Sequence, residues 1–524
     1  MQGEKIMKDL TSYVFSFEEL IRGNFLYIDK TEYIWNLIRP GSAGYFLSRP
    51  RRFGKSLTLS TLKAVFEGKK ELFKGLALYD KPYDWKPHPI IHLSFGDYNI
   101  ISNAKDELPD YLMTKVRKIA QEYSIPLPDD TPANCFSSLI DKLSEKGRVV
   151  ILMDEYDKPI LDNLTSPDVK ELLKILKGFY SVLKDRNEKE RFLFVTGVSK
   201  FCHVSLFSDL NNLTDITMDA RYATMLGYTQ EEFESNFKER IEAVEKKQNL
   251  NHADCLAEIR NWYDGFRFHA GSESVYNPVS LAKFFESGGE FSNYWFETGT
   301  PRFLVDLSKS RDFNFDSSLN EPVPAIALSA FEIDDIDPLT LLLQTGYVTI
   351  KSAEKKLGET WYKLDFPNRE VVGSFNTYLL NRYSGKTQTG VVKFTAELAA
   401  ALNDGDVKRL RKAMEVFFAG ISYEVYHKNE SNFQNIFFAL FRLLGINIKA
   451  ESHTCDGRID AVAETDKYVF IFEFKLDDDE TALSQIKEKK YCKQYELSGK
   501  KLFLNGVTFS TEKGQIINWQ TEEV

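Results

Sequence analysis

Short apolar runs alternate with longer helical patterns over the first two hundred residues, and this alternation limits the possible folds more than any other feature of the sequence. The runs lie at residues 45–48, 90–95, 149–154 and 192–198, with a weaker fifth at 213–218. They are rich in Val, Ile, Leu and Phe without polar alternation, which is typical of strands buried on both faces. Because helical stretches separate them, the sequence predicts an α/β domain with a parallel sheet.

The pattern changes twice further along the chain, whose 524 residues are too many for one hydrophobic core. From about residue 221 amphipathic helices take over, with examples at 230–237 and 239–248. The stretch 290–425 is mixed, mostly helical and indicates no chemistry. From residue 431 a helix pattern precedes three short strands, a helix and another strand. We therefore expect a core, a helical lid and middle region, and a smaller α/β domain, at residues 1–220, 221–425 and 426–524.

The loop Arg49-Pro-Arg-Arg-Phe-Gly-Lys-Ser56 follows the first predicted strand and opens a helix. This is the context of an ATP phosphate-binding loop, because the free N–H groups and positive dipole end of a helix attract anions. Lys55 would reach the β- and γ-phosphates and Ser56 would bind Mg²⁺. The alternative is a glycine that ends a loop before a solvated lysine. The predicted nucleotide-binding residues of the loop are Arg52, Phe53, Gly54, Lys55, Ser56 and Leu57.

The apolar run 149–153 ends in Asp154 and Glu155, where an α/β sheet binds its ligand. Asp154 would hold Mg²⁺, mainly through water, and Glu155 would be the general base that polarises the attacking water. An acidic pair that merely ends a strand is the alternative. Together with the loop, the pair favours an ATPase.

Polar side chains near these motifs are further candidates. The strand at 192–198 ends close to Thr196 and Ser199, either of which could sense the γ-phosphate, although a hydroxyl that only terminates a strand is an alternative. Arg49, Arg51 and Arg52 could add phosphate contacts or could form a merely solvated basic loop.

The N-terminal part resembles the AAA-ATPase-like family. The resemblance rests on SFEEL (16–20), YIDKTEYI (27–34), FLSRPRRFGKSL (46–57), IHLSF (91–95), MDEYDKP (153–159), TGVSKF (196–201), LGYTQEEF (226–233), WYDGFRF (262–268) and VYNP (275–278). Members of that family show RPRRFGKS in place of the glycine-first motif, so Arg49 resembles a family trait. The resemblance also implies that Tyr27, Asp29 and Lys30 could border the nucleotide.

A second constellation lies near the C-terminus, where Asp460 precedes the strand sequence Val469-Phe-Ile-Phe-Glu473-Phe-Lys475. Glu473 and Lys475 are two residues apart on a strand and share a face, and a hairpin would bring Asp460 alongside. Two adjacent carboxylates favour a divalent cation such as Mg²⁺ or Mn²⁺, and a neighbouring lysine can orient water. A solvated edge strand with alternating charges is the alternative.

The D-x₁₂-E-x-K spacing resembles the PD-(D/E)XK nuclease superfamily and implies a restriction-endonuclease-like domain. By that resemblance Glu430 could join the metal site, and Gln485 matches an auxiliary polar position. The fold also serves as an inactive binding module, so the function of the domain stays open. Residues 477–480 could form a second metal cluster, but an acidic run before a helix is the simpler interpretation. His453 with Cys455, and Cys202 with His203, we interpret as packing residues.

Composition narrows the class of protein. A net charge of -10 argues against a protein that coats nucleic acid through bulk electrostatics. The cysteines are odd in number and scattered, and no signal peptide or membrane-spanning run is present, so we expect a soluble, cytoplasmic protein without membrane contact. Two hypotheses remain: an ATPase that drives a Mg²⁺-dependent nuclease acting on DNA or RNA, or an ATP-switched binding module that does not cleave. An oligomer is compatible with either.

Overall fold

The structure, a computed structural model, divides the chain into two compact units. It describes residues 7–100, 103–200, 213–295, 302–328, 336–421, 430–445, 449–455, 458–477, 482–488, 495, 498–510, 513 and 515–524. The first unit comprises Met1–Gly299 and Val323–Asn368, and the second comprises Thr300–Pro322 and Arg369–Val524. This grouping differs from the three-part division at residues 220 and 425, which stays a prediction.

A five-stranded parallel sheet forms the centre of the first unit, which confirms the predicted fold class. Its strands are β1 (Ala43–Ser48), β2 (Ile90–Ser94), β3 (Val149–Asp154), β4 (Glu190–Gly197) and β5 (Leu213–Asp215). The order is β2-β3-β4-β1-β5. Strand β4 therefore lies between the strand that precedes the phosphate loop and the strand that ends in the acidic pair. Every residue of β3 is buried, as its unbroken apolar sequence predicts.

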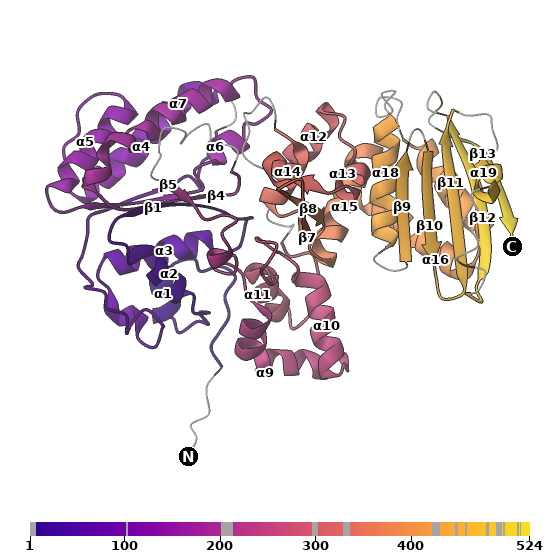
Figure 1. Cartoon of the computed structure of the whole chain (residues 1–524), viewed down its shortest axis with the longest axis horizontal. Helices are drawn as coiled ribbons and strands as arrows, with labels where there is room; N and C mark the ends of the chain where they lie inside the picture. The colour runs from indigo at the N-terminus through magenta and orange to yellow at the C-terminus, as the bar shows by residue number, and fades with distance from the viewer. Residues whose placement is uncertain are drawn as a thin grey trace, which may run out of the picture. The chain divides into compact units, whose positions relative to one another are not determined.

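Helices cover both faces of this sheet (Figure 1). One layer contains α1 (Phe17–Arg22), α2 (Thr31–Ile38) and α3 (Lys55–Phe66), and the other contains α4 (Ala104–Glu122), α5 (Pro132–Ser144) and α7 (Val169–Ser181). Short helix α6 (Lys158–Leu161) follows β3. The predicted helix at 55–66 has the observed bounds of α3, so the phosphate loop passes directly into it.

Helices α9 (Gln230–Gln248), α10 (His252–Tyr263) and α11 (Pro278–Glu286) occupy the region predicted as a helical lid, and we keep the name lid for them. The stretches at 230–237 and 239–248 are one continuous helix. It begins with a capping box in which Thr229 and Glu232 each bind the other's backbone N–H. The aromatic side chains of Phe233 and Phe237 lie in a core that also includes Ile28 from the N-terminal segment.

The second part of the first unit contains strands that the sequence did not predict. After α14 (Pro338–Thr345), β7 (Thr349–Lys356) and β8 (Glu359–Asp365) form an antiparallel hairpin. The two-residue strand β6 (Val323–Pro324) pairs with β8. The expectation of a mostly helical region missed this hairpin, because six of the eight residues of β7 are exposed and the strand has no continuous apolar face.

The second unit contains a mixed five-stranded sheet in the order β13-β12-β11-β10-β9. Strands β11 and β12 are parallel and their other neighbours are antiparallel. The predicted series of a helix, three strands, a helix and a strand is α18, β9, β10, β11, α19 and β12, and a further strand, β13, follows. Their bounds are α18 (Glu430–Leu444), β9 (Lys449–Cys455), β10 (Arg458–Glu464), β11 (Tyr468–Leu476), α19 (Ala482–Glu488), β12 (Lys501–Ser510) and β13 (Gln515–Glu523).

The two faces of this sheet carry different helices. Phe437 of α18 contacts Phe474 on one face, with ring centroids 4.2 Å apart. Ile486 of α19 packs with Val469 and Ile471 on the other. The unit also includes helices α12 (Arg302–Ser310), α13 (Phe315–Asn320), α15 (Arg369–Ser384), α16 (Gln388–Asp404) and α17 (Val407–Ala419).

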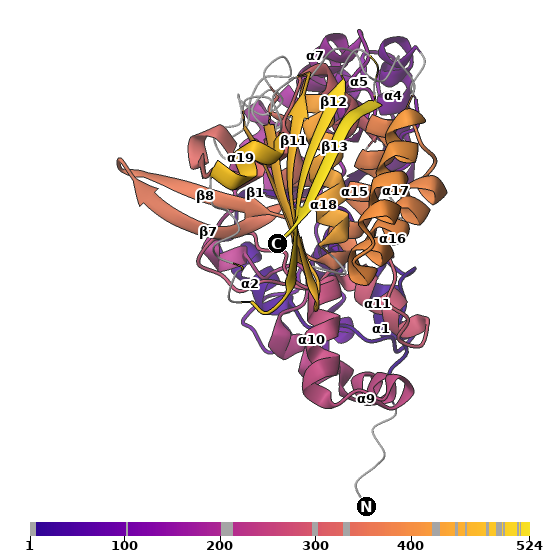
Figure 2. The same cartoon turned by 90° about the vertical axis from the view of Figure 1, so that its right-hand side faces the viewer.

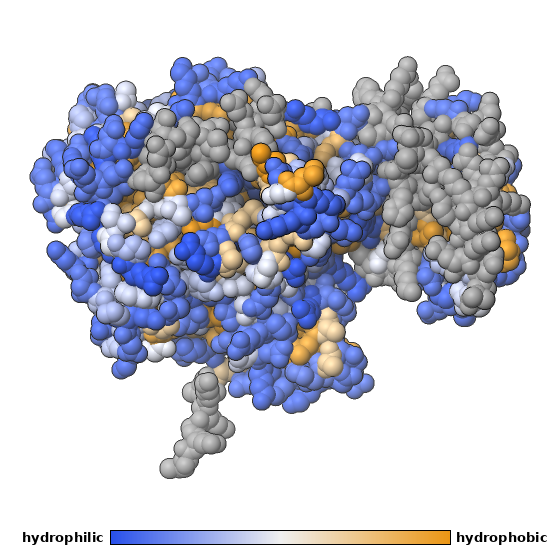
Figure 3. All heavy atoms as spheres, viewed as in Figure 1, coloured by the Kyte–Doolittle hydropathy of each residue, from blue (hydrophilic) through white to orange (hydrophobic). Residues whose placement is uncertain are grey.

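Hydrophilic residues predominate on the face of the molecule in Figure 3, and apolar residues occur there in small patches. None of the described helices combines the length and apolar composition needed to cross a bilayer.

Candidate functional site

The phosphate loop has the backbone geometry that an anion site at a helix N-terminus requires. Gly54 is the residue before α3 and has a φ of 93°, which lies in the left-handed region that favours glycine. Arg52 also has a positive φ, 67°. A non-glycine residue in this conformation costs free energy, and such residues gather at functional sites. The loop thus has a glycine where its backbone requires one and a disfavoured conformation at Arg52.

Ser56 and Asp154 meet at the carboxyl end of the sheet. The Ser56 hydroxyl donates a hydrogen bond of 2.5 Å to Oδ2 of Asp154. The other carboxylate oxygen, Oδ1, is buried and has no hydrogen-bond partner among the described residues. Burial raises the pKa of the Asp154 carboxyl, and the Ser56 hydroxyl and Lys55 ammonium oppose this rise. A buried oxygen without a donor, beside a serine hydroxyl, fits a Mg²⁺ ion, which prefers such ligands.

Lys55 lies in the same loop with its ammonium directed at backbone carbonyls. Its Nζ donates to the carbonyl oxygens of Arg49, at 2.9 Å, and Pro50, at 2.8 Å. The side chain is buried, which lowers the pKa of Lys55, and the carboxylates of Asp154 and Glu155 act in the opposite direction. The ammonium is therefore held inside the loop, where only two carbonyls and nearby carboxylates compensate its charge.

Glu155 follows Asp154 in the left-handed region, with a φ of 53°. It lines the same cavity as the phosphate loop. A Cβ built on Gly96, which follows β2, would lie 3.5 Å from Oε2 of Glu155. Since glutamate rarely adopts this conformation, the backbone strain is an independent sign that the position of Glu155 matters.

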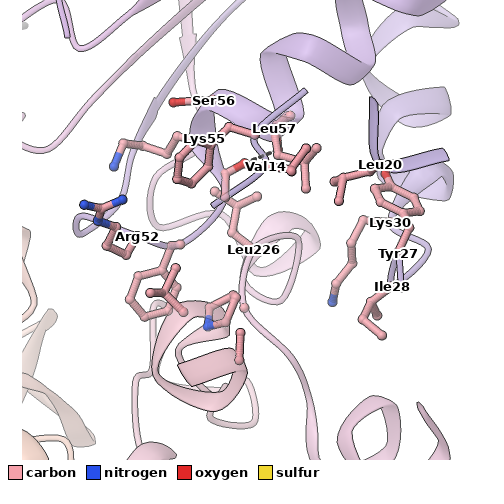
Figure 4. Close-up of a pocket in the computed structure, with 18 of the residues that line it drawn as sticks. Val14, Leu20, Tyr27, Ile28, Lys30, Arg52, Lys55, Ser56, Leu57 and Leu226 are labelled. Atoms are coloured by element: carbon pink, nitrogen blue, oxygen red, sulfur yellow. Dashed lines mark hydrogen bonds between the residues drawn. The ribbon is translucent and has the colours of Figure 1, made fainter. Parts of the chain in front are cut away.

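A cavity of about 620 Å³ extends from the phosphate loop to the N-terminal segment and the lid. This volume is in the usual range for sites that hold small molecules. Figure 4 shows the polar ends of Arg52, Lys55 and Ser56 on one side. Val14, Leu57 and Leu226 lie in the middle. Lys30 lies on the far side together with Leu20, Tyr27 and Ile28. The cavity thus offers a charged end, an apolar middle and a lysine on the far side.

The basic residues of the loop differ in their positions. Arg51 and Arg52 line the cavity, as a role in phosphate contact requires. Arg49 does not: its guanidinium donates to the carbonyls of Ser48, Thr217 and Tyr222 and stacks 4.1 Å from the centre of the Phe268 ring. Burial lowers the pKa of Arg49 to about 9. The suggestion that Arg49 contacts phosphate is wrong for this structure, because the guanidinium joins loop to lid.

Phe53, like Arg49, connects the phosphate loop to the lid. Its buried side chain packs edge-to-face against Phe266 and Phe268, with ring centroids 4.9 and 5.4 Å away. Both partners belong to the sequence WYDGFRF. These two aromatic side chains therefore hold the phosphate loop in place through Phe53.

Neither predicted γ-phosphate sensor directs its hydroxyl into the cavity. Thr196 donates to the carbonyl of Leu47, and Ser199 donates to Asp157 at 2.6 Å. Sequence reasoning missed Asp157, whose buried carboxylate also accepts the backbone N–H groups of Val198 and Ser199. A carboxylate three residues after Asp154 in MDEYDKP was the available signal. Asp157 connects the end of β3 to the end of β4.

Two of the three residues that the family resemblance placed near the nucleotide, Tyr27, Asp29 and Lys30, border the cavity. Tyr27 and Lys30 line it, and Lys30 forms an ion pair of 2.6 Å with Glu232 at the start of α9. Asp29 instead accepts hydrogen bonds from Thr31 and from the backbone of Ala77. Lys30 is thus a link from the cavity to the lid.

In the second unit, strand register brings the C-terminal positions together. Asp460 on β10 is directly opposite Glu473 on β11, and β10 pairs in turn with β9 so that His453 is opposite Asp460. Residues opposite one another on antiparallel strands lie on one face of the sheet. The three positions therefore form one row, and the hairpin register was the signal that could have added His453 to the sequence prediction.

Glu473 and Lys475 lie on the face covered by α19. Both are buried, and they continue the row of Val469 and Ile471, which pack against that helix. The parallel partner of Glu473 is Gly506. A Cβ there would lie 2.4 Å from the backbone nitrogen of Leu483 in α19, so the helix approaches this row at a glycine.

Several predicted positions lie partly or wholly outside the described residues. Cys202, His203 and residues 478–480 are outside, and Asp477 is exposed. Glu430 begins α18 and Gln485 lies in α19, with only their backbone described. The same holds for Asp460 on β10 and for His453 and Cys455 on β9. Within the described part of the chain, no group of three His, Cys, Asp or Glu side chains is arranged for a metal ion.

Comparison with known proteins matches two separate parts of the chain to two families. Residues 13–207 match the family described as "Predicted AAA-ATPase", and residues 428–519 match the family described as "PD-(D/E)XK nuclease superfamily". A protein of Azotobacter chroococcum mcd 1, "Uncharacterized protein in vnfD 5'region", is 38% identical over 531 residues, which cover 99% of each chain. No solved structure matches. The chain belongs to the AAA-ATPase-like family and has a C-terminal domain of the PD-(D/E)XK nuclease superfamily.

Proposed function

We propose that this protein binds and hydrolyses ATP at the phosphate loop and thereby controls a metal-dependent phosphodiesterase that acts on DNA or RNA. The observation that carries the first part is the contact between Ser56 and Asp154 beside a cavity of nucleotide size. In a P-loop ATPase these two residue types would hold Mg²⁺, which would neutralise charge on the nucleotide phosphates.

Each residue of the nucleotide site then has one task. Lys55 leaves the carbonyls of Arg49 and Pro50 and pairs with the β- and γ-phosphates, and the N–H groups around Gly54 bind phosphate oxygens. Ser56 and Asp154 would hold Mg²⁺, which neutralises phosphate charge. Glu155 accepts a proton from the water that attacks the γ-phosphorus.

The apolar middle of the cavity suits the nucleoside. Leu57, Val14 and Leu226 provide apolar surface for a base, while Arg52 and Phe53 shape the phosphate end. Burial of a base in this part of the cavity would bring the N-terminal segment and the lid into contact with the same ligand.

The C-terminal row supports the second part of the proposal. Asp460 and Glu473 would hold Mg²⁺, and Lys475 orients the water that attacks a phosphodiester or stabilises the charge that develops on the phosphate. The supporting observation is the direct pairing of residues 460 and 473, with Lys475 two residues along the same strand.

The central test is Lys55→Ala. We expect ATP affinity to fall at least about 100-fold, because an ammonium that pairs with two phosphates is lost. Titration calorimetry with ATP and Mg²⁺ measures this directly. Lys63→Ala, on an outer face of the same helix α3, is the matched control and should bind ATP like the wild type. Equal affinity of wild type and Lys55→Ala would reject the nucleotide site.

A further inference from the structure

The β7–β8 hairpin is an arm with little support from the rest of the first unit. Every residue from 351 to 359 is exposed, whereas residues 360–362, close to the contact with β6, are partly buried. Figure 2 shows the two strands extending outward as a ribbon. Isolated hairpins are at best marginally stable in water, so an arm of this kind is maintained for a contact rather than for a core.

The turn at the end of the arm has an unusual residue. Leu357 and Gly358 connect Lys356 to its partner Glu359, and both have positive φ, 51° and 83°, as in a type I′ turn. Asparagine, aspartate or glycine is favoured at the first of these positions. Leucine there is conformationally strained, and its side chain is fully exposed. A strained and fully exposed leucine indicates that the tip enters an apolar environment when a partner is bound.

The charge of the arm identifies the kind of partner. Residues 351–363 contain four lysines and two glutamates, a net charge of +2, in a chain whose net charge is -10. Lys356 is paired with Glu354. The exposed Lys355 and Lys363 have no carboxylate within ion-pair distance in the described part of the chain. An apolar tip followed by lysines without an ion-pair partner among the described residues suits a polyanion that has its charges on the outside and stacked apolar groups inside.

The base of the arm is anchored to the phosphate loop. A Cβ on Gly346, three residues before β7, would lie 2.6 Å from the ring of Pro50, so the backbone there touches the loop. Thr349, the first residue of β7, accepts a hydrogen bond of 2.7 Å from the N–H of Arg267. Arg267 adjoins Phe266 and Phe268, which pack on Phe53. The conformation of the loop and the direction of the arm are therefore linked.

We propose that the β7–β8 hairpin is a wedge that enters duplex DNA, with Leu357 inserted between stacked bases and Lys355 and Lys363 on phosphates. This inference rests on the proposed action of the chain on nucleic acid. A two-stranded ribbon fits a groove of B-form DNA, major or minor, whereas the major groove of A-form RNA is too narrow. Apolar side chains that unstack a base step are a known means of deforming a duplex.

The test uses the full chain and a DNA duplex with 2-aminopurine, whose fluorescence rises when the base is unstacked. Wild type with ATP and Mg²⁺ should raise the fluorescence, and Leu357→Asn should not. Asparagine suits the turn, so this variant should unfold at the same temperature as wild type or higher. Lys355→Glu with Lys363→Glu should weaken duplex binding at least about tenfold and lower the slope of log affinity against log salt by about 2.

The controls separate the arm from general surface effects. Val392→Gln removes another exposed apolar side chain, and Lys118→Glu with Lys177→Glu changes two other exposed lysines. Both should behave as wild type.

Three outcomes would overturn the wedge. If wild type binds and unstacks DNA and all hairpin variants do the same, the wedge alone is wrong. If wild type binds ATP but neither DNA nor an RNA duplex, the wedge and the nucleic-acid part of the proposed function both fail. If Leu357→Asn instead abolishes binding to a lipid vesicle or to a second copy of the chain, with DNA binding unchanged, the arm serves another partner.

Discussion

The nucleotide site and the C-terminal site are assembled in different ways. Ser56 and Asp154 are 98 positions apart, after strand β1 and at the end of strand β3, which β4 separates, so these three strands must assemble before the two residues meet. Asp460 and Glu473 are directly paired on neighbouring strands, so one hairpin is sufficient. The first site depends on topology and the second on register. The first should therefore respond to changes in distant packing, and the second mainly to changes in its own strands.

Lys475→Ala tests the independence of the two sites with the largest expected effect. We expect nucleic-acid cleavage to fall by about 10³-fold or more, because loss of a group that positions water or stabilises transition-state charge costs this much. ATP hydrolysis should be unchanged. Gel assays of cleavage and phosphate release measure the two activities.

Lys467→Ala, in the exposed turn before the same strand, is the control. If Lys475→Ala also abolished ATP hydrolysis, the two sites would be energetically coupled and the comparison would fail. If it cleaved like the wild type, the alternative of a binding module without cleavage would be favoured.

Glu155→Gln is expected to lower ATP hydrolysis by about 10²- to 10³-fold, since the amide cannot accept the proton from water. ATP affinity should be preserved, because glutamine has the same shape and Lys55, Ser56 and Asp154 are intact. Single-turnover hydrolysis and calorimetry distinguish the two effects. Exposed Glu145→Gln is the control. A parallel loss of affinity would assign Glu155 to binding instead of to hydrolysis.

The elements that the sequence predicted are those whose pattern is local. The buried strands, helix α3 and the α18–β12 series followed from apolar runs and turn signals, because two-sided burial leaves no polar alternation. The positions of Gly54, Lys55 and Ser56 at the start of α3 followed from the same reading. Register then follows from hairpin geometry, which is why the pairing of Asp460 with Glu473 could be foreseen.

Contacts between distant segments could not be read in this way. The sequence identifies Arg49 as a basic residue in a basic loop, but its partners are carbonyls of residues 217 and 222, which only the folded sheet brings near. The same holds for Asp157 and Ser199. The β7–β8 hairpin was not predicted for a different reason. Few of its residues are buried, and hydrophobic periodicity detects only elements that bury a face.

One glycine near the nucleotide site and one near the C-terminal site allow the two sites to be perturbed by the same kind of substitution. A Cβ on Gly197 would lie 2.4 Å from Oδ1 of Asp157, and one on Gly506 would lie 2.4 Å from the backbone of Leu483. We expect Gly197→Ala and Gly506→Ala each to lower the free energy of unfolding by about 1–3 kcal/mol through overpacking. Gly197→Ala should reduce ATP hydrolysis and with it the cleavage that ATP controls, whereas Gly506→Ala should reduce cleavage alone.

Denaturant unfolding and both activities of each variant provide the measurement. Gly178→Ala is the control, because a Cβ there meets open space inside α7 and should stabilise by up to about 1 kcal/mol. If Gly506→Ala also reduced ATP hydrolysis, the sites would not be separable.

The smallest expected effect concerns pH and the sheet on which the first site depends. Glu190 begins β4 and is buried, and burial raises its pKa to about 7 from 4.5, with Arg148 opposing the rise. The unfolded chain then ionises first as pH rises. Glu190 therefore costs no stability below pH 4.5, an increasing amount between 4.5 and about 7, and its full amount above that.

Glu190→Gln keeps the shape without the charge, so it should match wild type at pH 4 and exceed its free energy of unfolding at pH 8 by about 1–3 kcal/mol. Exposed Glu188→Gln should show no such pH dependence. Thermal unfolding at both pH values, followed with and without ATP, gives the test. If the gain in stability at pH 8 also strengthened ATP binding, the stability of the sheet would limit the affinity of the nucleotide site, as a site assembled by topology requires. A gain in stability without any effect on ATP binding would show that the loop is rigid independently of β4.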